Sequence, residues 1–224
     1  QKWDLAASDY TKAIEFNPKF ALAYIIRGNL YYNLQKWDLA ASDFTKAIEI
    51  NPKFALAYNN RGLLYSDLQK WDLAASDFTK AIEIYPKYVE AYNNRGLLYH
   101  NLKKYDQALA DFYKARDIDP NNLFALISIG LSNYEMGEIQ VAIKQFNQTL
   151  LLKSDLAETQ LALATTFYIN GDIEKAVKLA KSALNIDPKF ATLDYLKSNN
   201  WGDKLIADTQ KLLAHPELQS YVNK

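Results

Sequence analysis

Few side chains in this 224-residue chain could act directly in catalysis or hold a metal ion. Cysteine is absent, which excludes thiolate metal sites, cysteine nucleophiles and disulfides. The two histidines, His100 and His215, are far apart in the sequence, so they offer little for a zinc site or an acid–base relay. The sequence contains no phosphate loop and no recognisable nucleophile–base set. We therefore expect neither an enzyme nor a metal or cofactor site.

The charge balance restricts the class of partner. The chain has 26 lysines and arginines and 26 aspartates and glutamates, giving a formal net charge of zero. A nucleic-acid binder needs a basic surface to neutralise phosphates, and a membrane span needs about 18 consecutive apolar residues. Neither feature is present, so we expect no nucleic-acid and no membrane partner. The chain opens with Gln1 rather than Met, so we expect the native start to be missing; a cytoplasmic location is the default expectation.

Arginine and aspartate recur in register, at intervals of 34 residues. The arginines are Arg27, Arg61 and Arg95, and the aspartates are Asp43, Asp77 and Asp111. A guanidinium group can donate two parallel hydrogen bonds to a carboxylate, so the pattern predicts a structural Arg–Asp contact inside each repeat. At the next two points both residues are lost together, as Ile129 with Gln145 and as Leu163 with Leu179. The alternative is that these arginines bind a carboxylate of a ligand.

Asparagine recurs with the same spacing, at positions 59 and 60 and again at 93 and 94. An amide side chain carries both a donor and an acceptor. A row of asparagines could therefore pair with the backbone of an extended peptide without reading its side chains. The alternative is that these amides hydrogen-bond within the protein itself.

A 34-residue repeat positions these side chains. Segments 35–51 and 69–85 are identical except at their last residue, and a fixed period in this range is typical of a solenoid. Each repeat contains two amphipathic helical patterns, for example 55–68 and 71–84. Proline closes the repeats because it suits a helix boundary. The prolines lie at 18, 52, 86 and 120, and glycines lie at 28, 62, 96 and 130.

The repeats resemble tetratricopeptide (TPR) repeats. The resemblance rests on a large residue, Gly and Tyr in the first helix, on Ala, Phe and Ala in the second, and on Pro at the junction. It covers residues 1–190, and the sequence of the repeats is similar to TPR arrays of photosynthetic bacteria. The resemblance implies an all-α fold, a right-handed superhelix of antiparallel helix pairs. We add a C-terminal capping helix, because a helix over 203–214 has one apolar face that would seal the last repeat.

The repeat boundaries follow from the proline positions. Residues 1–20 supply only a second helix, so we expect the chain to be a fragment that lacks the preceding first helix. The predicted units are a partial repeat over 1–20, complete repeats over 21–54, 55–88 and 89–122, degenerate repeats over 123–156 and 157–190, and a cap over 191–224.

The resemblance also implies a binding groove. In TPR proteins the first helices line the concave face, and most differences among the first three repeats fall on this face. We therefore expect a protein-interaction scaffold whose groove holds a peptide or helix of a partner. Acids but no lysine or arginine occur in the groove, which favours a neutral or basic partner over an acidic one. The predicted groove residues are Ile25, Asn29, Asn59, Asn60, Leu63, Asp67, Glu90, Asn93, Asn94, Leu97, His100, Phe124, Ile127, Leu131, Tyr134 and Glu158.

Two other functions were weighed. A chaperone-binding TPR subfamily holds a terminal carboxylate with lysine and arginine. Ile25 and Glu90 occupy two of the matching positions, so that function is not expected here. The alternative that stays open is structural self-assembly as a homo-oligomer. The second helix at the amino end lacks its usual cover, which would expose Trp3, Leu5, Tyr10 and Ile14.

Overall fold

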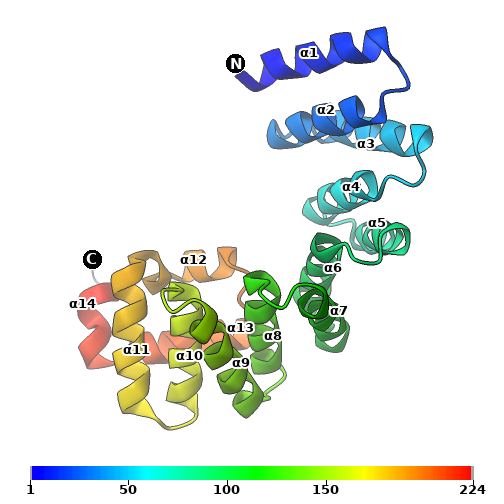
Figure 1. Cartoon of the computed structure of the whole chain (residues 1–224). Helices are drawn as coiled ribbons and strands as arrows, with labels where there is room; N and C mark the ends of the chain where they lie inside the picture. The colour runs from blue at the N-terminus through cyan, green and yellow to red at the C-terminus, as the bar shows by residue number, and fades with distance from the viewer. Residues whose placement is uncertain (1, 223–224) are drawn as a thin grey trace. The chain divides into compact units, whose positions relative to one another are not determined.

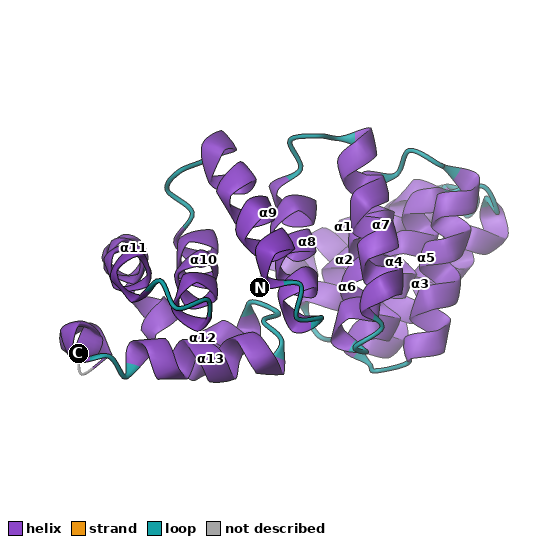
Figure 2. Cartoon of the chain, turned by 90° about the horizontal axis from the view of Figure 1, so that it is seen from below, coloured by secondary structure: helices purple, strands orange, loops and turns teal. Residues whose placement is uncertain are grey.

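The structure is a computed structural model that describes the backbone of residues 2–222 and the side chains of residues 5–222. Within this described part every regular element is a helix, as Figures 1 and 2 show. The all-α class is therefore confirmed. The helices are α1 (Lys2–Phe16), α2 (Ala21–Asn33), α3 (Trp37–Ile50), α4 (Ala55–Asp67), α5 (Trp71–Ile84), α6 (Val89–Asn101), α7 (Tyr105–Ile118), α8 (Leu123–Glu135), α9 (Ile139–Leu152), α10 (Ala157–Ile169), α11 (Ile173–Ile186), η1 (Pro188–Ala191), α12 (Leu193–Ser198), α13 (Asp203–Leu213), η2 (Pro216–Leu218) and α14 (Gln219–Val222).

The chain forms two compact units, residues 1–98 and residues 99–224. In the first unit α2 pairs with α3 and α4 pairs with α5, while α1 packs on α2 and α3 packs on α4. In the second unit α8 pairs with α9 and α10 pairs with α11, while α7 packs on α8 and α9 packs on α10. Consecutive antiparallel helix pairs therefore stack within each unit, as the repeat predicts.

A residue in the left-handed region ends the first helix of each repeat. Gln35 and Gln69 both have φ of 56° there, and at the same repeat position Gly137 and Gly171 have φ of 84° and 91°. The left-handed turn closes the helix because the N–H of Lys70 donates to the carbonyl of Tyr65, 2.8 Å away. Glycine takes this conformation without strain in the last two repeats, whereas Gln35, Gln69 and Lys103 take it in the first three complete repeats.

Small residues let the two helices of a pair approach closely. A Cβ atom built on Gly62 would lie 2.7 Å from the ring of Phe78, and one built on Gly130 would lie 2.3 Å from the ring of Phe146. These distances are shorter than a carbon–carbon contact, so only glycine fits. Both phenylalanine rings are fully buried and fill the space between helices.

The capping helix α13 is present, but it lies elsewhere than the sequence indicated. We expected it to seal the end of the last repeat; instead it packs across α8 and α10, the first helices of repeats four and five (Figure 2). Leu205 and Leu212 of α13 are buried in the same cluster as Leu131 and Leu161. The reason is that these first helices are apolar enough on that face to attract a helix. The last helix, α11, is contacted by η1 and η2.

Candidate functional site

A hollow of about 250 Å³ opens on the first helices of the first unit. Its walls come from α2 and α4, and its floor is the buried ring of Phe44 from α3. Three predicted groove residues line the hollow with two amides and an aliphatic side chain, two further residues of α2 add a phenol and an amide, and none of the lining residues carries a formal charge. The lining residues are Asn29, Tyr32, Asn33, Phe44, Asn60 and Leu63.

Asparagine side chains link successive first helices beside this hollow. The Nδ2 of Asn60 donates to Oδ1 of Asn29 at 2.9 Å, and the Nδ2 of Asn94 donates to Oδ1 of Asn59 at 3.0 Å. Asn59 also donates to Asn60 at 3.4 Å. Of the two interpretations of the asparagine row, hydrogen bonding within the protein is therefore the one that the structure contains. Each amide nitrogen carries two N–H groups, so Asn60 retains a donor beyond its bond to Asn29.

A tyrosine and an aspartate join two repeats at the rim of the hollow. The hydroxyl of Tyr32 donates to the carboxylate of Asp67, and the ring of Tyr32 packs edge-on against Trp37 with centroids 5.5 Å apart. Burial, reinforced by the bond to Asp67, raises the pKa of Tyr32, so the phenol stays protonated at neutral pH. Asp67 remains exposed and, through its bond to Tyr32, places a negative charge beside a residue that lines the hollow.

Three predicted groove residues of the first unit are closed off by neighbouring helices. Ile25 is 1% exposed and belongs to a buried cluster with Ala23 and Ala57, while Asn59 and Asn93 are 4% and 8% exposed. The prediction that these side chains face a ligand is wrong, because all three are buried; Ile25 and Asn59 meet the next first helix, through Ala57 and Asn94. The remaining members in the first unit, Asn29, Asn60, Leu63, Asp67, Glu90, Asn94 and Leu97, are half-buried or exposed.

Three predicted groove residues of the second unit are buried by the chain itself, and a fourth, Glu158, is partly covered. Tyr134 is fully buried, and its hydroxyl donates to Oδ2 of Asp208 in α13 at 2.8 Å. Glu158 accepts a hydrogen bond from Nε1 of Trp201 at 3.1 Å. Tyr134, His100 and Leu131 are therefore buried, and Glu158 is half-buried beside Trp201. Of the other two predicted residues in this unit, Phe124 is exposed and Ile127 is half-buried.

Burial changes the acid–base properties of two of the covered residues. It lowers the pKa of His100 to about 4, against a weaker opposing effect of the Asn200 backbone, so the imidazole is neutral at pH 7. The Nδ1 of His100 lies 2.9 Å from the hydroxyl of Ser132. Burial also raises the pKa of Glu158, while the bond from Trp201 acts in the opposite direction. Both groups report on whether the C-terminal segment is in place.

Two predicted Arg–Asp pairs are present, with both nitrogens of each fork engaged. Nε and Nη2 of Arg27 donate to Asp43 at 2.8 and 2.7 Å, and the same atoms of Arg61 donate to Asp77 at 2.8 and 2.9 Å. The pairs are largely buried. A ligand carboxylate would have to displace an aspartate from this geometry. The third pair, Arg95 with Asp111, involves both units and stays a prediction.

The same arginines also bond to the preceding repeat, which the sequence analysis missed. The Nη1 of each donates to a threonine in the preceding second helix, at 3.0, 3.1 and 2.8 Å for Arg27, Arg61 and Arg95. The sequence could have predicted these hydrogen bonds, because the threonines recur with the same 34-residue period as the arginines. Tyr113 replaces threonine where Ile129 replaces arginine. The three acceptors are Thr11, Thr45 and Thr79.

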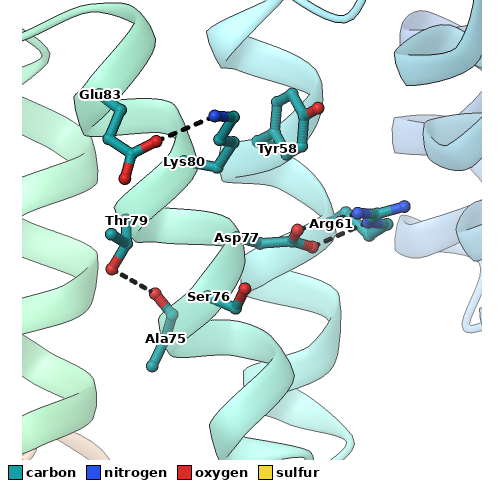
Figure 3. A pocket seen from close by; sticks show the side chains of 8 residues that line it. All are labelled: Tyr58, Arg61, Ala75, Ser76, Asp77, Thr79, Lys80 and Glu83. Atoms are coloured by element: carbon teal, nitrogen blue, oxygen red, sulfur yellow. Dashed lines mark hydrogen bonds and ion pairs between the residues drawn. The ribbon is translucent and has the colours of Figure 1, made fainter.

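Two larger polar hollows lie beside these arginines. One of about 470 Å³ lies between α4 and α5 (Figure 3), and an equivalent one of about 570 Å³ lies between α2 and α3. Within the hollow of Figure 3, Arg61 is paired with Asp77, and Lys80 is paired with Glu83 at 2.9 Å. The ionic groups drawn there already satisfy one another. These hollows therefore offer a ligand less than the uncharged hollow of α2 and α4.

The helix predicted for self-association is partly covered. Ile14 is 9% exposed and packs in a cluster with α2, so it is not a free contact, and Tyr10 is half-buried against the same cluster. Leu5 is 69% exposed, yet Leu39 and Leu73 at the same repeat position are 48% and 50% exposed. Exposure of Leu5 is thus a property of the repeat. The side chain of Trp3 lies outside the described residues, and self-association stays a prediction.

Searches for other kinds of site gave negative results within the described residues. These residues contain no cluster of three or more histidine, cysteine, aspartate or glutamate side chains that could hold a metal ion. None of their helices has the length and apolar composition needed to span a bilayer.

Comparison with protein-family models gave matches over most of the repeats. Models described as tetratricopeptide repeat match residues 55–88 and 89–122 and, separately, residues 157–190. A model described as TPR repeat matches residues 28–69. No curated protein matches the chain.

Comparison with solved structures gave neighbours of the same fold. The chain is similar to YrrB, a TPR protein with an unusual peptide-binding site, with 23% identity, a TM-score of 0.68, and coverage of 92% of this chain and 99% of that one. It is similar to PilW, a type IV pilus biogenesis factor, with 21% identity, a TM-score of 0.68, and coverage of 89% and 97%. It is also similar to the first TPR domain of Spaghetti (RPAP3), bound to an HSP90 peptide, with 28% identity, a TM-score of 0.51, and coverage of 52% and 93%.

Proposed function

Because this chain belongs to the tetratricopeptide repeat family, we propose that it is a non-enzymatic scaffold that binds a segment of a partner protein on the first helices of its first unit. The observation that carries the proposal is the uncharged hollow of about 250 Å³ between α2 and α4. Its size suits one medium-sized side chain of a ligand. Similar solved structures include a protein with a peptide-binding site and another bound to a peptide, which supports this class of function.

The hydrogen bonds at the hollow support recognition of a peptide backbone. Asn29 and Asn60 are held by their mutual bond of 2.9 Å, so a ligand does not have to order them. Asn33 is exposed at the rim and adds a donor and an acceptor. Each hydrogen bond between the ligand backbone and such an amide side chain contributes about 1 kcal/mol net. The ligand side chain that enters the hollow therefore supplies the rest of the affinity.

The charges around the hollow favour a neutral or basic partner. The lining residues are uncharged, and Asp67 lies at the rim, hydrogen-bonded to Tyr32. Glu90 of α6 is exposed on the same set of first-helix positions. A basic residue of the ligand would be attracted by these carboxylates, whereas an acidic one would be repelled.

A Leu63→Arg variant tests the proposal, because it fills the hollow with a bulky cation. Peptides are selected against the parent protein from a random 12-residue display library, and their dissociation constants are measured by fluorescence anisotropy. We expect the selected peptides to be neutral or basic and to bind Leu63→Arg at least tenfold more weakly than the parent.

Leu39→Arg is the matched control, since Leu39 is 48% exposed on the second helix α3. This variant adds the same charge away from the hollow and should bind like the parent. Equal binding of the selected peptides to the parent and to Leu63→Arg would contradict the proposed site.

A further inference from the structure

The helix α13 occupies the position that a ligand would take on a first-helix face. It packs on α8 and α10, which carry the groove positions of repeats four and five (Figures 1 and 2). The consequences are visible at equivalent positions. Leu63 is half-buried in the first unit, whereas Leu131 and Thr165, at the same repeat position, are 4% and 0% exposed.

The contacts of α13 resemble those of a bound helix. Its first turn is capped by the repeat itself, because Oε1 of Glu135 accepts from the backbone N–H of Leu205 at 2.9 Å and Oε2 accepts from that of Lys204 at 3.3 Å. These N–H groups have no partner inside a helix, so an external carboxylate stabilises them. The helix therefore begins against Glu135, which occupies the same repeat position as the predicted groove residue Asp67.

Two side-chain contacts fix the register of α13 further along. The carboxylate of Asp208 accepts from the hydroxyl of Tyr134, and the hydroxyls of Thr209 and Thr165 lie 2.8 Å apart. Leu205 and Leu212 supply the apolar part of the interface. The opposite face of α13, which includes Ala207 and Gln210, is exposed. Only one face of α13 therefore contacts α8 and α10.

Gly202 lies directly against the side chain of Glu135 in α8. A Cβ atom built there would lie 2.2 Å from Cδ of Glu135. The residue has φ of −74°, so the glycine is not needed for a left-handed backbone; what it provides is room for the side chain of Glu135. Any side chain at this position competes with the carboxylate that caps α13.

From these contacts we infer that the face across α8 and α10 is a second, helix-binding surface, which the chain's own α13 fills and from which an amphipathic partner helix displaces it. The inference rests on the proposed function only in that both use first-helix faces; the residues are different. The partner is a helix with zero net charge, like segment 203–213. It presents free N–H groups to Glu135, a carboxylate to Tyr134, a hydroxyl to Thr165 and leucines to the apolar floor.

The affinity of such a partner depends on how often α13 leaves the surface. If α13 were undocked 1% of the time, the apparent dissociation constant would be raised about a hundredfold. Weakening the cis contacts should therefore reveal binding in trans. A synthetic peptide of residues 200–215, acetylated, amidated and labelled with fluorescein, serves as the probe.

The probe is titrated into the full chain and its variants and followed by anisotropy. We expect Gly202→Ala to bind it at least tenfold more tightly than the parent. Gln210→Ala, on the exposed face of the same helix, should bind like the parent. Adding Thr165→Arg to Gly202→Ala should abolish binding. Adding Leu63→Arg should not, which separates this surface from the hollow of the first unit.

Hydrogen exchange of the parent and each variant decides the remaining cases. We expect α13 to exchange at least tenfold faster than α10 in the parent, because it opens independently. If Gly202→Ala leaves α13 docked, Leu205→Asp with Leu212→Asp replaces it in the titration. Three outcomes would overturn the inference. The first is equal protection of α13 and α10 in the parent, and the second is loss of helicity beyond α12–α14 in that double variant. The third is a variant with α13 undocked that fails to bind the probe.

Discussion

The two units build the same helix pairs with different chemistry. In the first unit Arg61 pairs with Asp77 and reaches Thr45 of the preceding repeat, so an ionic and hydrogen-bonded link fastens three helices. In the second unit the equivalent positions of repeat five hold Leu163 and Leu179, which pack in the apolar cluster. The geometry of the fold therefore does not depend on the ion pair. What the arginine adds is a double hydrogen bond within its own repeat, to Asp77, and a further hydrogen bond to Thr45 of the preceding repeat.

The same units differ in what covers their first helices. The positions of Leu63 and Tyr32 stay partly open, whereas those of Thr165 and Tyr134 are buried beneath the C-terminal segment. The second unit therefore has both features: apolar residues in place of the Arg–Asp pair, and first helices covered by the C-terminal segment. The comparison suggests a division of labour, with an open face at the amino end and a self-occupied face at the carboxyl end.

The largest effect is expected from breaking the ion pair on one side. Arg61→Ala leaves the carboxylate of Asp77 buried without its fork, which should cost about 3 kcal/mol of unfolding free energy in the first unit. Protection of α4 and α5 against hydrogen exchange measures this loss. Replacing both partners, Arg61→Leu with Asp77→Leu, copies Leu163 and Leu179 and should recover most of it. A double variant as unstable as the single one would contradict the equivalence of the two chemistries.

A second test uses acid, which should act on the second unit through His100. The folded state holds this imidazole at a pKa of about 4, so lowering the pH below 6.5 protonates the unfolded chain first. Stability should therefore fall between pH 7 and pH 5, by about 2 kcal/mol. Denaturant unfolding, read from exchange in α8 and α10, measures it. Glu158, whose pKa is raised, acts in the opposite direction.

His100→Gln serves as the control for the acid test. It keeps a side chain able to bond to Ser132 and removes the titrating group. The slope of stability against pH should flatten in this variant. A slope that persists unchanged would assign the acid sensitivity to other groups.

The smallest effect concerns the turn inside each repeat. Gln69 holds a φ of 56°, where Gly137 and Gly171 stand in the second unit. A non-glycine residue is strained in this region, so Gln69→Gly should stabilise the first unit by about 0.5–1 kcal/mol. Gly171→Gln should destabilise the second unit by a similar amount, measured as a shift in the midpoint of denaturant unfolding. Two shifts of the same sign would show that the turns are not equivalent.

The sequence alone determined the helix pairs and the Arg–Asp contacts in the first two complete repeats. These features depend on residues within one period or on positions exactly one period apart, so a repeated pattern is enough to predict them. The threonine link to Arg27 and Arg61 could have been predicted in the same way, since it also follows the period.

Only the tertiary structure decided which groove residues are open. Asn59 turned inward because neighbouring first helices close over its position, and Tyr134 was covered by Asp208, 74 residues further along the chain. Burial depends on everything that packs against a side chain, including segments outside the repeat. Periodicity assigns a residue to a face, whereas the folded chain decides whether that face meets solvent.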